Sequence, residues 1–152
     1  MAYAERNPDF DRNLAFLAYG LLFFAVFFAG APALIAVAIA HARRNVADPL
    51  VRRHHAYQIW VFWIGFGLAL LAGGSALAFL VTGVMEFVNA GQGGITNLEE
   101  LFASLSDNRA LFSFFVTAIT LTLLSGLWLA AASAYGFFRL ASGKPIVQTR
   151  EP

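Results

Sequence analysis

Three histidines are the residues of this chain best suited to metal or haem chemistry. His41, His54 and His55 are close in sequence, and neutral imidazoles bind zinc, copper and haem iron. A bis-histidine haem would take His41 from one helix and His54 or His55 from the next. However, neighbouring side chains on a helix point apart, so only one of the adjacent pair is expected to face a bundle. Asp48 is the nearest carboxylate that could orient a ligand. The pattern therefore favours headgroup contact or a structural hydrogen bond over ligation, with no cofactor and no metal.

A glutamine follows the histidine pair. His54 and Gln58 are four residues apart and therefore share a helix face. Gln58 would form a polar latch to another helix if it is buried, and it would contact lipid headgroups if it lies near the membrane surface. The sequence leaves both interpretations open.

Charged residues are absent from three long stretches of the chain. Residues 13–42, 56–85 and 110–138 contain no Asp, Glu, Lys or Arg. Transporters and pumps usually place ionisable groups at membrane depth, so this absence argues against a self-contained transporter and against acid–base catalysis in the bilayer. A dyad of a histidine with Ser125 or Ser133 would also need both at the same depth. The chain has no cysteine, which excludes disulfides and thiolate ligands. We expect that the protein is not an enzyme.

The composition is that of a membrane protein. Of the 152 residues, 59% are hydrophobic and 12% are charged, whereas soluble domains are about 45–50% apolar and about 25% charged. A net charge of +1 gives no reason to expect nucleic acid as a partner. A spanning helix needs about 20 apolar residues. We therefore predict one membrane domain over residues 1–152, with spans at about 14–41, 56–85 and 110–138.

The first apolar stretch allows two other interpretations. A cleaved signal peptide would end near Ala29-Gly30-Ala31, but the mixed charges before it and the apolar run to Ala40 argue against cleavage. Gly30 and Pro32 could instead divide the stretch into a re-entrant hairpin, in which each half is too short to span. A single kinked span is the simpler expectation.

Basic residues predict the orientation. Arg43, Arg44, Arg52 and Arg53 precede the second span, and Arg139 and Lys144 follow the third. Acidic residues dominate the other connection. Short loops rich in Lys and Arg stay in the cytoplasm, where these side chains contact lipid headgroups. We expect a bacterial inner-membrane protein with its N-terminus outside and its C-terminus in the cytoplasm.

The external connection is predicted to hold a short amphipathic helix at about 97–106. Leu98, Leu101, Phe102 and Leu105 form one apolar stripe, and Thr96 with Glu99 has capping-box spacing. Asp107 and Asn108 are candidate caps for the third span. The expected fold is an all-α integral membrane three-helix bundle with this helix in its second connection.

Small residues recur every four positions on the last two spans. Such faces allow helices to approach closely. We predict that the two spans pack together through them; pairing between copies in a homo-oligomer is the alternative. The residues are Gly65, Ala69 and Gly73 on one span and Gly126, Ala130 and Ala134 on the other.

Two motifs, "RHHAYQIWVFWIG" and "AYGFFRLASGKP", resemble those of a family of small, largely uncharacterised three-span bacterial membrane proteins. That family is related to Tic-type import components and includes the magnetosome proteins MamF and MmsF. The matching residues are His54, Gln58, Ile59, Phe62 and Trp63, and Gly136, Leu140, Gly143, Lys144 and Pro145. Trp60 and Ala132 stand where the family usually has arginine. The resemblance implies the three-span topology, and it implies little about function.

These patterns lead to one functional expectation with two alternatives. We expect a non-enzymatic accessory or assembly factor that contacts lipid and other membrane proteins through its helices. A subunit of an oligomeric pore or transport system is the first alternative. A haem- or metal-binding electron-transfer subunit using His41 and His54 or His55 is the second.

Overall fold

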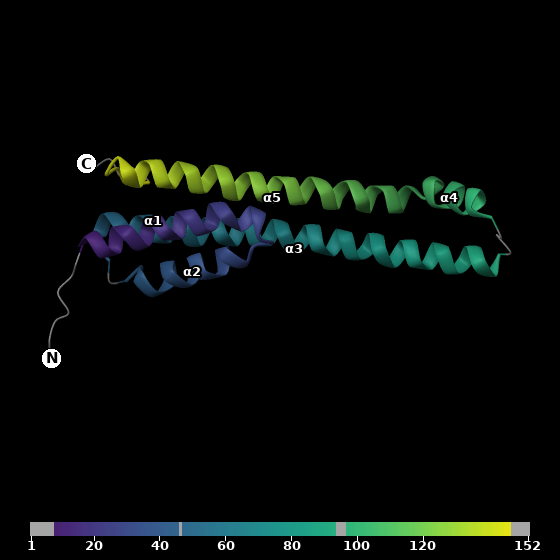
Figure 1. Cartoon of the computed structure of the whole chain (residues 1–152), viewed down its shortest axis with the longest axis horizontal. Helices are drawn as coiled ribbons and strands as arrows, with labels where there is room; N and C mark the ends of the chain where they lie inside the picture. Colours follow the sequence, from purple (N-terminus) through teal and green to yellow (C-terminus); the bar gives the residue numbers. More distant parts are fainter. Residues whose placement is uncertain (1–7, 46, 94–96, 147–152) are drawn as a thin grey trace, which may run out of the picture. The chain divides into compact units, whose positions relative to one another are not determined.

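The protein is all-α in a computed structural model that describes residues 8–45, 47–93 and 97–146 (Figure 1). Helix α1 runs over Pro8–Phe24 and continues into a 3₁₀ turn, η1, over Ala25–Phe27. Helix α2 covers Ala31–Arg43, and the long helix α3 covers Pro49–Gln92. The short helix α4 covers Leu98–Asp107 and leads directly into α5, Arg109–Ala141.

Three helices are long and apolar enough to cross a membrane, as the sequence predicts. They are Asp9–Phe27, Pro49–Gln92 and Arg109–Ala141. The all-α class and the number of candidate spans are therefore confirmed, and the chain is a multi-pass membrane protein. Helix α2 has only 13 residues, which corresponds to about 20 Å at 1.5 Å per residue.

The prediction of a single kinked first span is wrong. The backbone reverses at Phe28–Gly30, where Ala29 and Gly30 have φ angles of 49° and 83°. Pro32 lies in the first turn of α2, where a proline costs no hydrogen bond. The left-handed glycine followed by this proline therefore starts a new helix rather than bending the old one. Asp11 on α1 pairs with Arg43 at the end of α2, so α1 and α2 form an antiparallel hairpin.

Side-chain hydrogen bonds connect the first helix to the last. Arg12, near the start of α1, donates from Nη2 to the carbonyl oxygens of Leu140 and Ala141 at the end of α5, both at 3.4 Å. The start of α1 and the end of α5 therefore lie together. The predicted orientation in the membrane, with the N-terminus outside and the C-terminus in the cytoplasm, stays a prediction.

The chain divides into two compact units. The first unit is Met1–Phe66 with Gly126–Pro152, and the second is Gly67–Ser125. The core of the first unit consists largely of alanines and a few larger side chains from α1, α2, α3 and α5, which allows the helices to approach closely. One cluster of its buried residues is Ala18, Leu22, Ala25, Ala33, Ala36, Val61, Phe62, Leu129 and Ala132, and a second is Ala15, Tyr19, Ala47, Val51 and Leu140.

The second unit holds the amphipathic helix and its caps. Asn97 caps α4 by accepting a hydrogen bond from the Glu100 N–H at 2.8 Å, whereas Thr96 lies outside the described residues. Asn108 caps α5 through the Leu111 N–H and also donates to Glu86 Oε1 of α3 at 2.6 Å. Leu98 and Phe102 are exposed, as expected for an amphipathic helix at a membrane surface; the side chains of Leu101 and Leu105 lie outside the described part.

The predicted small-residue stripes are only partly packing faces. A Cβ atom at Gly65 would lie 2.8 Å from Leu129 Cδ2, so α3 and α5 are close at this level. Ala69 and Gly73 are exposed, and a Cβ at Gly73 would contact nothing within 4 Å. The prediction that Ala69 and Gly73 pack against the last span is therefore wrong.

On α5, Gly126 faces the hairpin rather than α3. Its added Cβ would lie 3.3 Å from Val26 Cγ1 of η1. Ala130 and Ala134 are half-buried. The stripe on α5 misleads because a four-residue spacing assumes one partner for each face, while the hairpin supplies a second partner at Gly126.

Gly136 is the closest helix contact that the small-residue pattern missed, and it provides a stability test. A Cβ at this position would overlap the Tyr19 ring. We expect Gly136→Ala to lower the free energy of unfolding by about 1–3 kcal/mol, the usual cost of overpacking. Gly20→Ala on α1 is the matched control, because a Cβ there enters open space. Unfolding in mixed detergent micelles measures both variants; equal effects would contradict the contact.

Candidate functional site

Polar side chains from several helices meet in the first unit, and we call this group the polar cluster. Its members are Asp11 and Tyr19 of α1, Arg43 of α2, and His54, His55 and Gln58 of α3, together with the C-terminal segment 139–145. His54, His55 and Gln58 are fully buried, and Asp11 is 3% exposed. Polar groups buried this deeply require partners, because each unsatisfied group costs about 1–3 kcal/mol.

His54 connects three segments that are distant in sequence. Its Nδ1 lies 2.9 Å from Tyr19 Oη, and its Nε2 lies 3.1 Å from the carbonyl oxygen of Lys144. A carbonyl only accepts, so Nε2 carries the proton, and Tyr19 then donates to the unprotonated Nδ1. The neutral imidazole is thus satisfied at both nitrogens, and it joins α1, α3 and the C-terminal segment.

The end of α5 is shaped to present that carbonyl. Gly143 adopts a φ of 64°, and the Lys144 N–H donates to Arg139 O at 2.9 Å. This is the geometry of a Schellman cap, which glycine accommodates most easily. Arg139 also donates from Nε to Pro145 O at 3.1 Å. The chain beyond α5 is thereby folded back toward His54.

His55 and Gln58 connect α3 to the hairpin. Gln58 donates from Nε2 to the Ala15 carbonyl of α1 at 2.8 Å, and its Oε1 accepts from His55 Nδ1 at 2.9 Å. Gln58 therefore makes the contact expected of a polar latch, although its side-chain partner is His55 rather than His54. The remaining nitrogen of His55, Nε2, is buried without a hydrogen-bond partner among the described residues.

An ion pair holds the open end of the hairpin. Arg43 Nε donates to Asp11 Oδ1 at 2.9 Å, and Nη2 contacts the same oxygen. Asp11 is nearly buried while Arg43 is about one-third exposed. The guanidinium also lies 5.6 Å from the centre of the Phe10 ring. This pair was not expected from sequence, where Arg43 was taken as a headgroup contact.

The other basic residues predicted to contact headgroups are mostly exposed. Arg44, Arg52, Arg53 and Lys144 are exposed, and Arg139 is half-buried. His54 and His55 are buried and make structural hydrogen bonds, which is one of the two outcomes expected from the sequence. The expectation that only one of them faces the bundle is wrong. His54 bonds to Tyr19 of α1 and to the Lys144 carbonyl of the C-terminal segment, whereas His55 bonds to Gln58 one turn along α3.

The geometry gives little room for ligation by the histidines. His41 is exposed, and its Nδ1 donates to Val37 O at 3.0 Å. Both nitrogens of His54 are already hydrogen-bonded. Within residues 8–45, 47–93 and 97–146, no three His, Cys, Asp or Glu side chains group as a metal site. The hydrogen bonds of the polar cluster connect α1, α2, α3 and the C-terminal segment at the end of α5.

Asp11 and Tyr19 are the residues of the polar cluster that sequence reasoning missed. They are eight residues apart, so with Ala15 between them they share one face of α1. Two polar side chains on one face of an otherwise apolar helix are a signal that a helical projection of α1 would have shown. Their partners could not be read from the sequence, because those partners depend on the hairpin.

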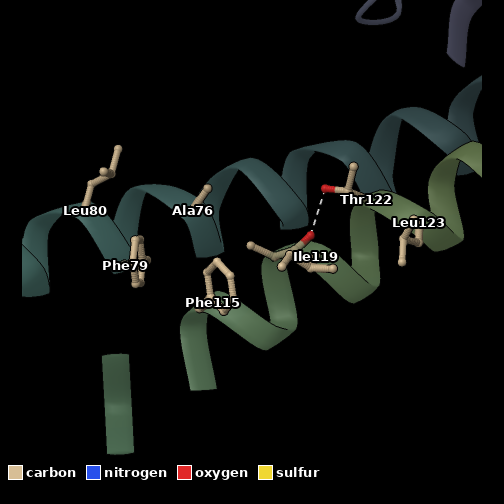
Figure 2. A pocket seen from close by; sticks show the side chains of 8 residues that line it. Ala76, Phe79, Leu80, Phe115, Ile119, Thr122 and Leu123 are labelled. Carbon is tan, nitrogen blue, oxygen red and sulfur yellow. Dashed lines mark hydrogen bonds between the residues drawn. The ribbon is translucent and has the colours of Figure 1, made fainter. Parts of the chain in front are cut away.

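The second unit contains an open apolar groove of about 400 Å³ between α3 and α5 (Figure 2). Thr122 is its one hydroxyl-bearing residue, and that hydroxyl donates to Ala118 O at 2.8 Å. Phe79 and Phe115 lie with ring centres 5.5 Å apart. The lining is Ala76, Phe79, Leu80, Phe115, Ala118, Ile119, Thr122 and Leu123. Such a surface suits hydrocarbon or an apolar helix and offers no group for acid–base chemistry.

The two motifs that carry the family resemblance meet in the polar cluster. His54 and Gln58 come from the first motif, and Gly136, Gly143 and Lys144 come from the second. Comparison of the chain with protein-family models, with curated proteins and with solved structures gives no match.

The ion pair allows a comparison between adjacent arginines. We expect Arg43→Gln to lower the free energy of unfolding by about 2 kcal/mol, because it leaves the Asp11 carboxylate buried without its partner; fully buried pairs cost about 3–5 kcal/mol to break in this way. Arg44→Gln, at an exposed position, should change stability little. Asp11→Asn should restore part of the loss in the Arg43→Gln background. Unfolding measurements on the three variants would contradict the pairing if Arg43 and Arg44 behaved alike.

The hydrogen bonds also predict opposite tautomers for the adjacent histidines. His54 should carry its proton on Nε2, because Lys144 O accepts from it, and His55 should carry its proton on Nδ1, because Gln58 Oε1 accepts from it. Nitrogen-15 NMR of histidine-labelled protein in bilayers distinguishes the two forms. Tyr19→Phe should change the His54 signals and leave those of His55 in place. Identical tautomers at the two residues would refute the assigned network.

Proposed function

We propose that this chain is a non-enzymatic accessory or assembly factor of the bacterial inner membrane, which acts through contacts of its helices with another membrane protein. The polar cluster is the observation that carries the proposal. Its hydrogen bonds connect helix to helix and helix to C-terminal segment, so its polar side chains serve the fold. Exposed large apolar side chains are numerous along α3 and α5.

The exposed apolar faces of the second unit support contact with lipid and with a partner. Large side chains along α3 and α5 point outward, among them Leu77, Leu80, Val84, Leu123 and Phe112. Unpartnered faces of this size in a membrane protein contact acyl chains or other helices. The groove described above adds a concave surface into which a partner helix could pack.

The basic residues support an orientation with the polar cluster toward the cytoplasm. Arg12, Arg43, Arg44, Arg139 and Lys144 belong to the same end of the first unit as the hydrogen bonds of that cluster. Short segments rich in Arg and Lys are retained in the cytoplasm. Membership of the three-span bacterial family remains a prediction, supported by the way its two motifs meet.

Photo-crosslinking in native membranes tests the proposed role. A photoreactive amino acid at exposed Leu80 or Leu123 should give one recurrent adduct with a different membrane protein, whereas the same probe at fully buried Val61 should give none. Adducts formed only between copies of this chain would favour the pore-subunit alternative. Exclusive crosslinking to lipid from both exposed positions would refute the accessory role.

A further inference from the structure

The turn of the hairpin carries a dense group of exposed aromatic side chains. Phe24, Phe27 and Phe28 are 55%, 70% and 62% exposed, and Phe23 and Val26 beside them are also exposed. The rings contact one another, with centre distances of 5.7 Å for Phe23–Phe24 and 6.4 Å for Phe24–Phe27. We call residues 23–30 the hairpin tip. Apolar surface concentrated in this way is costly in water.

Four backbone N–H groups at and just after the hairpin tip are hydrogen-bonded within the turn. The N–H groups of Phe28 and Gly30 both donate to Ala25 O, at 3.2 and 2.9 Å. The Ala31 N–H donates to Phe28 O at 3.1 Å, and the Ala33 N–H donates to Gly30 O at 3.0 Å. A turn in hydrocarbon requires its backbone groups to be paired in this way. The sequence of the turn, Phe28-Ala29-Gly30-Ala31, also contains no polar side chain.

The opposite end of the hairpin is polar. Asp11 and Arg43 form their ion pair there, and Arg12 and Arg44 are exposed beside it. Charged side chains are excluded from the bilayer centre and settle at the interface. One end of the hairpin therefore fits the headgroup layer, and the other fits the acyl chains.

The lengths of the two arms determine how far the hairpin reaches. The 13 residues of α2 span about 20 Å, and the 14 residues from Asp11 to Phe24 span a similar distance. The hydrocarbon core of a bilayer is about 30 Å thick. With Asp11 and Arg43 at one interface, the hairpin tip stops inside the core and does not reach the other interface.

We propose that the α1–η1–α2 hairpin is a re-entrant membrane element that enters and leaves the bilayer on the side of the C-terminal segment. Its aromatic tip lies among the acyl chains. Only α3 and α5 then cross the membrane, although α1 by itself has the length and composition of a span. This arrangement goes beyond the proposed accessory role and does not depend on it.

Single cysteines test the arrangement cleanly, because the native chain contains none. Asn13→Cys and Asn45→Cys report on the open end of the hairpin, Phe28→Cys on its tip, Ser142→Cys on the end of α5, and Gln92→Cys on the end of α3. All five positions are exposed. The full chain is labelled with a membrane-impermeant maleimide in spheroplasts and in inverted inner-membrane vesicles.

Positions 13, 45 and 142 should react in the same preparation, and position 92 should react in the other. Phe28→Cys should react in neither, because thiolate formation is suppressed in hydrocarbon, and should react fully once the membrane is dissolved in SDS. Labelling of Phe28→Cys together with Gln92→Cys would show that α1 crosses the bilayer and would overturn the proposal.

Three further outcomes test the proposal beyond the labelling pattern at the tip. Asn13→Cys does not alter the tip, and its labelling on the side of Gln92→Cys would by itself refute the re-entrant path. Oxidative crosslinking of Phe28→Cys into dimers at low protein density would place a second copy of the chain, rather than lipid, against the tip. A fluorophore attached at Phe28→Cys should be quenched at least two-fold more by lipids brominated deep in the acyl chain than by headgroup quenchers; the reverse order would also refute insertion.

Discussion

The structure of the first unit depends on the satisfaction of polar groups in apolar surroundings. His54 lies fully buried between α1, α3 and the segment after α5, and each of its nitrogens has one partner. Individual hydrogen bonds between helices in membranes contribute only about 0.6 kcal/mol on average. Their directionality matters more, because a buried imidazole has few positions in which both nitrogens are satisfied. The registers of α1 and of the C-terminal segment against α3 follow from that restriction.

Small residues allow these hydrogen bonds to form. In lipid, helices gain little from apolar contact as such, since acyl chains are equally apolar, so close packing must supply the attraction. The alanines of the core and Gly136 bring the backbones near enough for Tyr19 to reach His54. Tyr19 lies directly over Gly136, so the same ring both fills the space that glycine leaves and donates its hydroxyl proton. Packing and hydrogen bonding are therefore coupled at this residue.

The sequence predicted the features that depend on local composition. The charge-free stretches located α3 and α5, and the stripe around Leu98 and Phe102 located α4, because hydrophobicity and helical period are local properties. Asn108 was among the expected caps and is observed as one. The chain reversal at Gly30 was also visible as a glycine followed closely by Pro32, but a kink and a turn share that signature.

The features that the sequence did not predict depend on partners. Asp11 could not be paired with Arg43 until α1 and α2 were known to be antiparallel, and Gly126 could not be assigned to the hairpin until η1 was known to lie beside it. The reversal at Gly30 escapes a count of basic residues for the same reason, since such a count distinguishes loops but not the number of reversals between them. The expectation of a kink rather than a chain reversal at Gly30 therefore accounts for more than one wrong prediction.

The two ends of the hairpin are stabilised by different interactions. The open end is held by contacts within the chain, whereas the tip is exposed. At the open end, the Asp11–Arg43 pair and the bond from Gln58 to Ala15 O hold it against the rest of the first unit. Near the tip, Val26 lies close to Gly126 of α5, while Phe27 and Phe28 face outward. The open end thus depends on polar partners within the chain, whereas the tip depends on apolar surroundings that the chain does not itself supply. An element of this kind keeps its position through the first set of contacts and adapts to the membrane through the second.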